Sequence, residues 1–419
     1  MLTSHHRSLA RRIVWTLFTA QSFGSAGFLV AATVTTLVGA KLTGSPRFAT
    51  VPGAIYQLGI SAAAFSWGYG MDRLGRRGGL TLGLALGTLG ALLATYSVIA
   101  GSLTFFLLGL IFMGIANSAL QLARFAAAEV HTADERGRAI SNVVIGGTVS
   151  AVFWFLFSDT IETFMEGYGL DALAWPYIVS AAMFIIATLV LFTFLRPDPR
   201  DLGREIASLQ TEQHSGARSS QPARPILEIL RQPAAFVAMS AMVFGQVVMI
   251  MLMVITSLHM QDHQHNIGAI SKVISIHVIG MFAFSIVSGR LADRFGRGPV
   301  IVAGAATLIL ACLAAPLSPD VLPLGVALFL LGLGWNFCYV GGSSLLADQL
   351  SPDERARTQG FNDLLIGLVS AAGSLGSGFV FAAVGFGVMG LVGAMAALIP
   401  LTLTLWWQVT KPSAVVAAS

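Results

Sequence analysis

The chain has 419 residues and a formal net charge of +4, with 55% hydrophobic and only 11% charged residues. Soluble domains carry about 25% charged residues. The composition therefore excludes a soluble globular protein and predicts an all-α membrane protein with many spans. The small positive charge reflects the membrane topology described below, and we expect no nucleic-acid partner.

Long apolar runs recur along the whole chain, and a transmembrane helix needs about 20 such residues. We predict twelve transmembrane helices, at roughly 13–40, 50–70, 79–100, 102–128, 139–161, 173–195, 233–260, 267–289, 299–317, 321–346, 358–384 and 386–409. The first run is long and lacks a small-residue cleavage site. It is therefore predicted to be a span and not a removed signal peptide.

Basic residues gather at one side of these spans. Arginines precede the first span and follow the second, fourth, sixth, eighth and tenth spans, whereas the opposite side carries only Lys41, Arg47 and Lys272. Because cytoplasmic loops are enriched in Lys and Arg, we expect both termini in the cytoplasm. The predicted location is the bacterial inner membrane, as a multi-pass protein.

A glycine- and arginine-rich motif follows the second span and recurs after the eighth. The first copy reads Gly68-Tyr-Gly-Met-Asp72-Arg73-Leu-Gly75-Arg76-Arg77. The second copy, 221 residues later, reads Gly289-Arg-Leu-Ala-Asp293-Arg294-Phe-Gly296-Arg297. Glycine permits a close backbone approach, and the aspartate can pair with arginines and helix ends. We predict that both copies are gating motifs that close the cytoplasmic side.

A second pair of similar segments, 128–138 and 347–357, repeats at an offset of 219 residues. Two repeats at nearly one offset indicate two homologous halves of six helices. We predict an N-terminal half at 1–195, a cytoplasmic linker at 196–232 and a C-terminal half at 233–419. With these motifs the chain resembles the major facilitator superfamily, which implies a fold that transports by alternating access.

Two charged side chains inside spans are candidates for coupling transport to protons. Arg124 lies in the fourth span about one turn from its cytoplasmic end, and Asp363 lies near the predicted start of the eleventh. Charged residues within a membrane are often functional. The alternatives are that Arg124 extends its charged head to the interface and that Asp363 caps its helix. For Asp363 we favour the cap.

The stretch from Met239 to Met281 holds seven of the 14 methionines. Within it Met249 and Met253 are four residues apart on the seventh span, and His277 and Met281 are four apart on the eighth, so each pair lies on one helix face. Three thioethers and an imidazole are soft neutral donors that favour Cu(I). We predict these four as a metal site. Residues of a possible uptake route lie at its mouth: His259, Met260, His263 and His265.

On these two pairs the chain resembles the CcoA-like copper importers of the superfamily. The resemblance implies import of copper across the bacterial inner membrane to supply maturation of cbb3-type cytochrome oxidase, with the same four residues as ligands. The cargo would be a copper ion or a copper complex, with no prosthetic group. We expect a monomer whose other partner is the lipid bilayer.

Other functions stay open. A proton-coupled transporter of organic solutes or drugs is the alternative, supported by the fold, Arg124 and Asp363. Drug exporters of the superfamily typically carry a Gly-Pro signature in the fifth span, and this chain has no proline between Ala139 and Ile161. A third possibility is a metal-sensing membrane partner without transport. The sequence has no G-x-x-x-x-G-K-[ST] motif and no nucleophile–base arrangement, so we expect neither an ATP-driven pump nor an enzyme.

Overall fold

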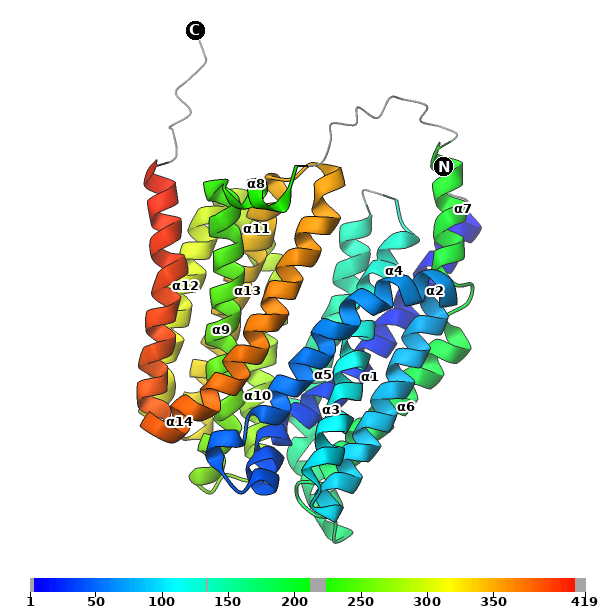
Figure 1. Cartoon of the computed structure of the whole chain (residues 1–419). Coiled ribbons are helices and arrows are strands. Elements are labelled where there is room, and N and C mark those ends of the chain that lie inside the picture. The colour runs from blue at the N-terminus through cyan, green and yellow to red at the C-terminus, as the bar shows by residue number, and fades with distance from the viewer. Residues whose placement is uncertain (1–3, 133–134, 212–223, 411–419) are drawn as a thin grey trace.

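The computed structural model describes residues 4–132, 135–211 and 224–410 (Figure 1). Part of the predicted linker, 212–223, and the last nine residues of the predicted C-terminal half lie outside these ranges. The described residues form helices joined by short turns. The all-helical fold predicted from composition is therefore confirmed.

The helices of the first half are α1 (Ser4–Thr43), α2 (Val51–Ala100), α3 (Leu103–Gln121), α4 (Ala123–Glu129), α5 (Arg136–Gly167) and α6 (Trp175–Phe194). Between the halves lie α7 (Pro199–Thr211) and α8 (Ile226–Leu230). The second half holds α9 (Pro233–Asp262), α10 (Ile267–Phe282), α11 (Ser285–Phe295), α12 (Arg297–Ala314), α13 (Val321–Asp348) and α14 (Pro352–Thr410). Two short 3₁₀ turns, Pro46–Phe48 and Ala315–Leu317, complete the order.

Ten helical stretches in the described part are long and apolar enough to cross a membrane. One of them, Thr358–Thr410, is 53 residues long and reverses at Gly385. The helix α2 reverses in the same way at Gly75, so an arm that begins at Val51 precedes the candidate stretch Gly70–Ala100. When each arm is counted as one pass, the described residues contain twelve helical passes, which is the number predicted from the sequence.

Both reversals occur at glycines in a backbone conformation that other residues avoid. Gly75 has φ 79° and ψ 167°, and Gly385 has φ 75° and ψ 179°. This region of backbone space is essentially restricted to glycine, because a side chain there costs about 1–3 kcal/mol. The two glycines differ in their surroundings. A Cβ atom on Gly75 would meet the carboxylate of Asp198, whereas one on Gly385 would meet nothing within 4 Å.

Local sequence also explains where two helices of the second half begin. Pro233 stands in the first turn of α9, where its missing N–H costs no hydrogen bond. Asn266 precedes α10, and its side-chain oxygen accepts a hydrogen bond of 2.9 Å from the Ala269 amide. These boundaries place the His263–Asn266 turn at the end of the molecule opposite the termini (Figure 1).

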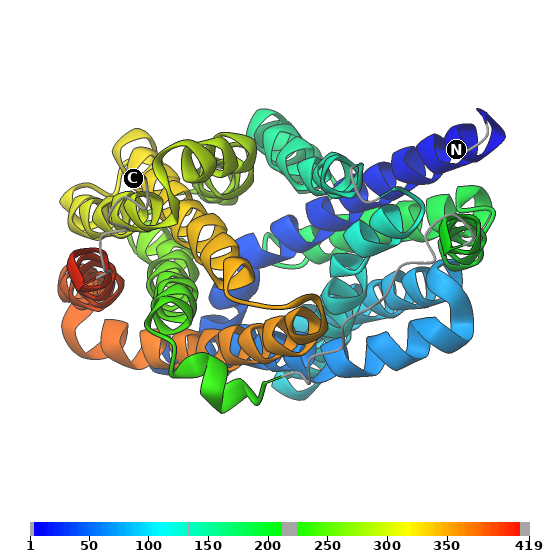
Figure 2. The same ribbon diagram turned by 90° about the horizontal axis from the view of Figure 1, so that it is seen from above.

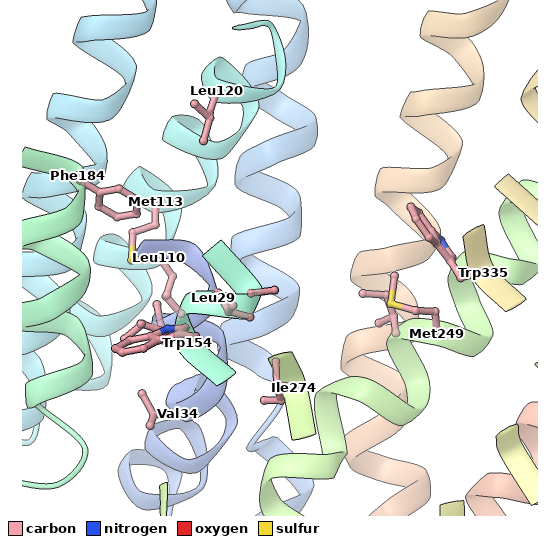
Figure 3. Packing of buried hydrophobic residues seen from close by; sticks show 14 of the residues in the cluster. Leu29, Val34, Leu110, Met113, Leu120, Trp154, Phe184, Met249, Ile274 and Trp335 are labelled. Atoms are coloured by element: carbon pink, nitrogen blue, oxygen red, sulfur yellow. The ribbon is translucent and has the colours of Figure 1, made fainter. Parts of the chain in front are cut away.

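The end that carries both described termini, α7 and α8 is called the cytoplasmic end here, after the positive-inside expectation, and the opposite end is called the outer end (Figure 1). Seen from the cytoplasmic end, the two groups of helices lie side by side (Figure 2). One buried apolar cluster runs through both groups and includes Leu29, Trp154, Ile274 and Met249 (Figure 3). The middle of the molecule is therefore closely packed across the two halves.

Each described end of the linker is held by an ion pair or a helix cap. The Asp198 carboxylate accepts hydrogen bonds of 3.0 Å from the Arg76 and Arg77 amides, at the start of the second arm of α2. At the other end the Glu354 carboxylate, on a residue only 2% exposed, accepts a bond of 2.8 Å from Arg224 Nε. The Arg224 guanidinium lowers the pKa of Glu354 well below its usual range.

The two reversal glycines predict different costs of substitution. Gly75→Ala and Gly385→Ala both place a side chain in a strained conformation, but only Gly75→Ala also displaces Asp198 from the amides that it caps. We expect Gly75→Ala to lower the melting temperature in detergent by several degrees more than Gly385→Ala. Equal losses for the two variants would show that the Asp198 contact contributes nothing.

Candidate functional site

The four predicted metal ligands lie on α9 and α10, as the sequence indicated. The two helices nevertheless pack mainly against other elements: α9 against α14 and α13, and α10 against α13 and α5. Met249 and His277 are buried, whereas Met253 and Met281 are partly exposed. The described side-chain hydrogen bond of His277 is to the Leu328 carbonyl on α13, and no described hydrogen bond joins the His277 side chain to α9.

His277 has one ring nitrogen engaged and one free. Its Nδ1 lies 2.9 Å from the Leu328 carbonyl oxygen. A carbonyl only accepts, so Nδ1 carries the proton and a neutral ring has a lone pair on Nε2. The residue is 1% exposed, and Nε2 has no partner in the described part of the chain. A buried acceptor without a partner is unusual and requires an explanation.

The predicted uptake route at the outer end is only partly at the surface. His263 is exposed, and its Nδ1 lies 2.8 Å from the His259 carbonyl oxygen. The His259 ring stacks on Phe386, with centroids 4.1 Å apart and planes at 10°. His265 is half-buried. Met260 is 0% exposed, so it lies beneath this surface and not on it.

The two predicted coupling residues lie near each other, one in each half. Arg124 lies on α4, and its positive charge is close enough to the Tyr339 hydroxyl on α13 to interact with it. The Asp363 carboxylate on α14 lies close enough to interact with the same positive charge, and it accepts a bond of 3.0 Å from Gln359 Nε2.

The preferred structural alternative for Asp363 was wrong. The helix α14 begins at Pro352, so Asp363 lies three turns inside it and does not cap its start. The predicted eleventh span, 358–384, covers the apolar core of this helix and omits most of the polar turns that precede it. An ionisable side chain inside a helix and opposite an arginine from the other half is a stronger candidate for function than a cap.

A polar and aromatic network beside these residues was not predicted. The Trp335 indole N–H donates to Gln246 Oε1 at 2.7 Å, and Gln246 Nε2 donates to Ser370 Oγ at 2.9 Å. Trp335 also stacks on Tyr339, with centroids 4.9 Å apart and planes at 19°. We call Gln246, Trp335 and Tyr339 the aromatic wall.

The aromatic wall could have been predicted from the position of its residues within the two helices. Gln246 and Trp335 lie at the midpoints of α9 and α13. Buried Trp and Gln side chains need hydrogen-bond partners, which points to a shared network near the middle of the membrane. Met249, one turn along α9 from Gln246, packs in the same apolar cluster as Trp335 (Figure 3). This placement gives Met249 a packing role beside the wall.

The two gating motifs form matching ion-pair sets. In the first, Arg76 lies 3.4 Å from Asp72 and 2.7 Å from Glu129. In the second, Arg297 lies 2.7 Å from Asp293 and 3.2 Å from Asp348. Each set of described ion pairs therefore stays inside its own half.

The other members of the motifs are glycines within or between helices and arginines outside these ion pairs. Gly296 has φ 92°, at the same place in its motif as Gly75. Gly68 and Gly289 lie inside helices, and a Cβ atom on Gly289 would meet no other atom within 4 Å. Arg73 is exposed, and the Arg294 guanidinium lies 5.3 Å from the Phe295 ring.

The outer end is where described hydrogen bonds join the halves. The Glu162 carboxylate on α5 accepts bonds from the Ile267 and Gly268 amides, 3.1 and 2.8 Å long, at the start of α10. Asp159, one turn before Glu162 on α5, forms an ion pair with Lys272 on α10. The Thr36 hydroxyl donates to the Val254 carbonyl at 2.8 Å. The structure is therefore a conformer whose halves are closed against each other at the outer end.

Comparison with known proteins agrees with this architecture. A family model described as Major Facilitator Superfamily matches residues 14–271 and 237–418. The chain is 33% identical over 402 residues to the uncharacterized MFS-type transporter YdeG of Bacillus subtilis, covering 96% of this chain and 93% of that protein. It is 30% identical over 370 residues to the riboflavin transporter RfnT of Brucella anthropi, covering 87% of each.

A solved structure shows the same fold at low identity. The crystal structure of the nucleoside transporter NupG matches with a TM-score of 0.66 and 15% identity, over 95% of this chain and 98% of that one. The fold and the family match together define a multi-pass membrane transporter built from two groups of helices. The chain belongs to the major facilitator superfamily, and it is not an enzyme.

The bonds at the outer end predict that Glu162 sets the balance between closed and open conformers. A buried, charge-assisted hydrogen bond contributes about 1.5–3 kcal/mol, so Glu162→Gln is expected to raise the outward-open fraction about tenfold. Spin labels on cysteines introduced at Gly167 and Gln261 would report the separation of the outer ends. Glu166→Gln, an exposed carboxylate one turn away, is the matched control. Identical distance distributions for the two variants would contradict this role.

Proposed function

We propose that this chain is a secondary transporter of a planar heteroaromatic organic solute, with riboflavin as the first compound to test. The observation that carries the proposal is the aromatic wall, which presents two stacked rings next to amide and hydroxyl groups near the middle of the helices. The similarity to the riboflavin transporter RfnT over 87% of both chains supports the same substrate class.

The chemistry of the wall fits such a solute. Trp335 and Tyr339 are held nearly parallel, and the Gln246 bond fixes the indole in that orientation. A flat ring system that stacks on them gains about 0.5–1.5 kcal/mol beyond the burial of apolar area. Neighbouring amide and hydroxyl groups are suited to ring carbonyls and to a polyol side chain, which need hydrogen-bond partners on leaving water.

Transport in this proposal follows alternating access. The halves rock about a site near the middle of the membrane, and the outer-end bonds of Glu162 are released when that end opens. Arg124 and Asp363 couple the motion to a proton, because a protonated Asp363 no longer attracts the guanidinium of the opposite half. The gating motifs, each paired within one half, brace the cytoplasmic ends of the helices during the motion.

The proposed setting is the inner membrane of a bacterium, as for the bacterial relatives. Both termini lie on the cytoplasmic side in this proposal, and the protein works as a monomer in the bilayer. The division into halves at 1–195 and 233–419 with a linker at 196–232 remains the working description of the chain.

Copper is the second candidate cargo, because one observation favours it. The Nε2 lone pair of His277 is buried and has no partner among the described residues. A neutral imidazole nitrogen with thioethers nearby is a donor set that suits Cu(I). In that alternative Met281, one turn from His277, and the pair Met249 and Met253 on α9 complete the ligands after a movement of α9 relative to α10.

The riboflavin proposal predicts a loss of uptake when Trp335 is replaced. In proteoliposomes Trp335→Leu is expected to reduce riboflavin uptake about tenfold, the effect of losing roughly 1.4 kcal/mol, while Trp335→Phe retains most of it. Trp406→Leu alters an exposed tryptophan at the end of α14 and serves as the control. Absence of riboflavin uptake by the unmodified protein, or equal uptake by the Trp335 and Trp406 variants, would overturn the proposal.

The copper alternative has its own test. His277→Asn keeps a side-chain N–H that can donate to the Leu328 carbonyl but removes the free Nε2. If copper is the cargo, radioactive copper uptake is expected to fall at least tenfold in His277→Asn while the protein stays folded. Riboflavin uptake that persists in this variant, together with no copper uptake by the unmodified protein, would reject copper.

A further inference from the structure

A cavity of about 610 Å³ lies between the cytoplasmic ends of α1 and α5, away from the proposed transport site. Residues at helical spacing line it from both sides. From α1 come Arg7, Arg11, Val14, Trp15 and Phe18, and from α5 come Arg138, Asn142, Ile145 and Val149. Positions that differ by three, four or seven share one face of a helix. One face of each helix therefore lines the cavity, together with Val130, His131 and Glu135 from the segment between α4 and α5.

The cytoplasmic rim of the cavity carries unbalanced positive charge. Arg7, Arg11 and Arg138 are exposed, and none has an ion-pair partner among the described residues. Glu135 is the only carboxylate that lines the cavity in the part of the chain described, and the Thr132 hydroxyl donates to it at 3.3 Å. Three guanidinium groups facing one carboxylate leave a site that attracts an anion.

The deeper wall of the cavity is apolar and exposed. Trp15 is 60% exposed, Ile145 46% and Val149 45%. These side chains lie about one to three turns further along α1 and α5 than the arginines, in the direction of the membrane interior. Tryptophan is enriched at the level of lipid headgroups, so Trp15 marks where the basic rim meets the hydrocarbon region.

We propose that this cavity binds an anionic phospholipid from the cytoplasmic leaflet, with its phosphate among Arg7, Arg11 and Arg138 and an acyl chain along Trp15, Ile145 and Val149. Guanidinium groups bind phosphate oxygens in pairs of hydrogen bonds, and basic pockets between transmembrane helices on the cytoplasmic side suit acidic headgroups. The apolar wall distinguishes a lipid from a soluble phosphate, because a free anion gains nothing from it.

The lipid site is connected through α5 to the hydrogen bonds that close the outer end. The helix α5 carries Arg138 and Asn142 at one end and Glu162 at the other, and Glu162 binds the start of α10. A lipid that ties α1 to α5 at the cytoplasmic end would hold the two helices as one body while the halves rock. This inference does not depend on which solute the protein carries.

The test is lipid retention in native mass spectrometry after reconstitution with phosphatidylglycerol or phosphatidylcholine. We expect phosphatidylglycerol to be retained several-fold more than phosphatidylcholine. The triple variant Arg7→Gln, Arg11→Gln, Arg138→Gln is expected to lose that preference. A control triple, Arg12→Gln, Arg204→Gln, Arg231→Gln, makes the same charge change at exposed arginines outside the cavity and is expected to keep it.

Two further measurements keep the proposal open to rejection. Phosphatidylglycerol with brominated acyl chains is expected to quench protein fluorescence less in Trp15→Phe than in the unmodified protein, which places the chain beside Trp15. Inorganic phosphate is expected not to displace the lipid. Equal retention by the two triple variants, equal retention of both lipids, or displacement by millimolar phosphate would each overturn the proposal.

Discussion

A buried carboxylate joins the two halves at the outer end, and the conformer described here depends on it. Glu162 leaves water only because two backbone amides at the start of α10 satisfy it. The first amides of a helix have no partner within the helix and carry partial positive charge. The bond therefore brings together two groups that would each be costly to bury alone, and it ends as soon as the halves separate.

Several polar side chains within the helices are likewise buried together with hydrogen-bond partners. Asn336 donates to the Met281 carbonyl at 2.6 Å and to Ser285 Oγ at 2.9 Å, and Gln246 uses both ends of its amide. In a medium without water, such groups either pair or mark a place where something else binds. Ten buried side-chain atoms in the described part of the chain have no hydrogen-bond partner, and the Nε2 of His277 and the Nε of Arg124 are the two that belong to predicted functional residues.

Methionine shows why residue type is a weaker guide than placement. The cluster between Met239 and Met281 suggested a metal site, yet Met239, Met242, Met249 and Met260 are all buried among apolar neighbours. Thioether side chains are flexible and fill irregular gaps in a core, so helical spacing of methionines is compatible with packing alone. The similarity to RfnT and the aromatic wall together favour an organic solute over copper as the cargo.

The sequence by itself determined the class of protein, the membrane passes, the two repeats and the glycine-containing motifs that they carry. Those features depend on apolar length, on local backbone conformation and on repetition along the chain, all of which are readable within a few turns of helix. Only the tertiary structure decided that Arg124 lies near Tyr339 and Asp363, that Glu162 caps α10 and that Trp335 pairs with Gln246. These partners are 89 or more residues apart, and their meeting is fixed by how whole helices pack, which no local pattern records.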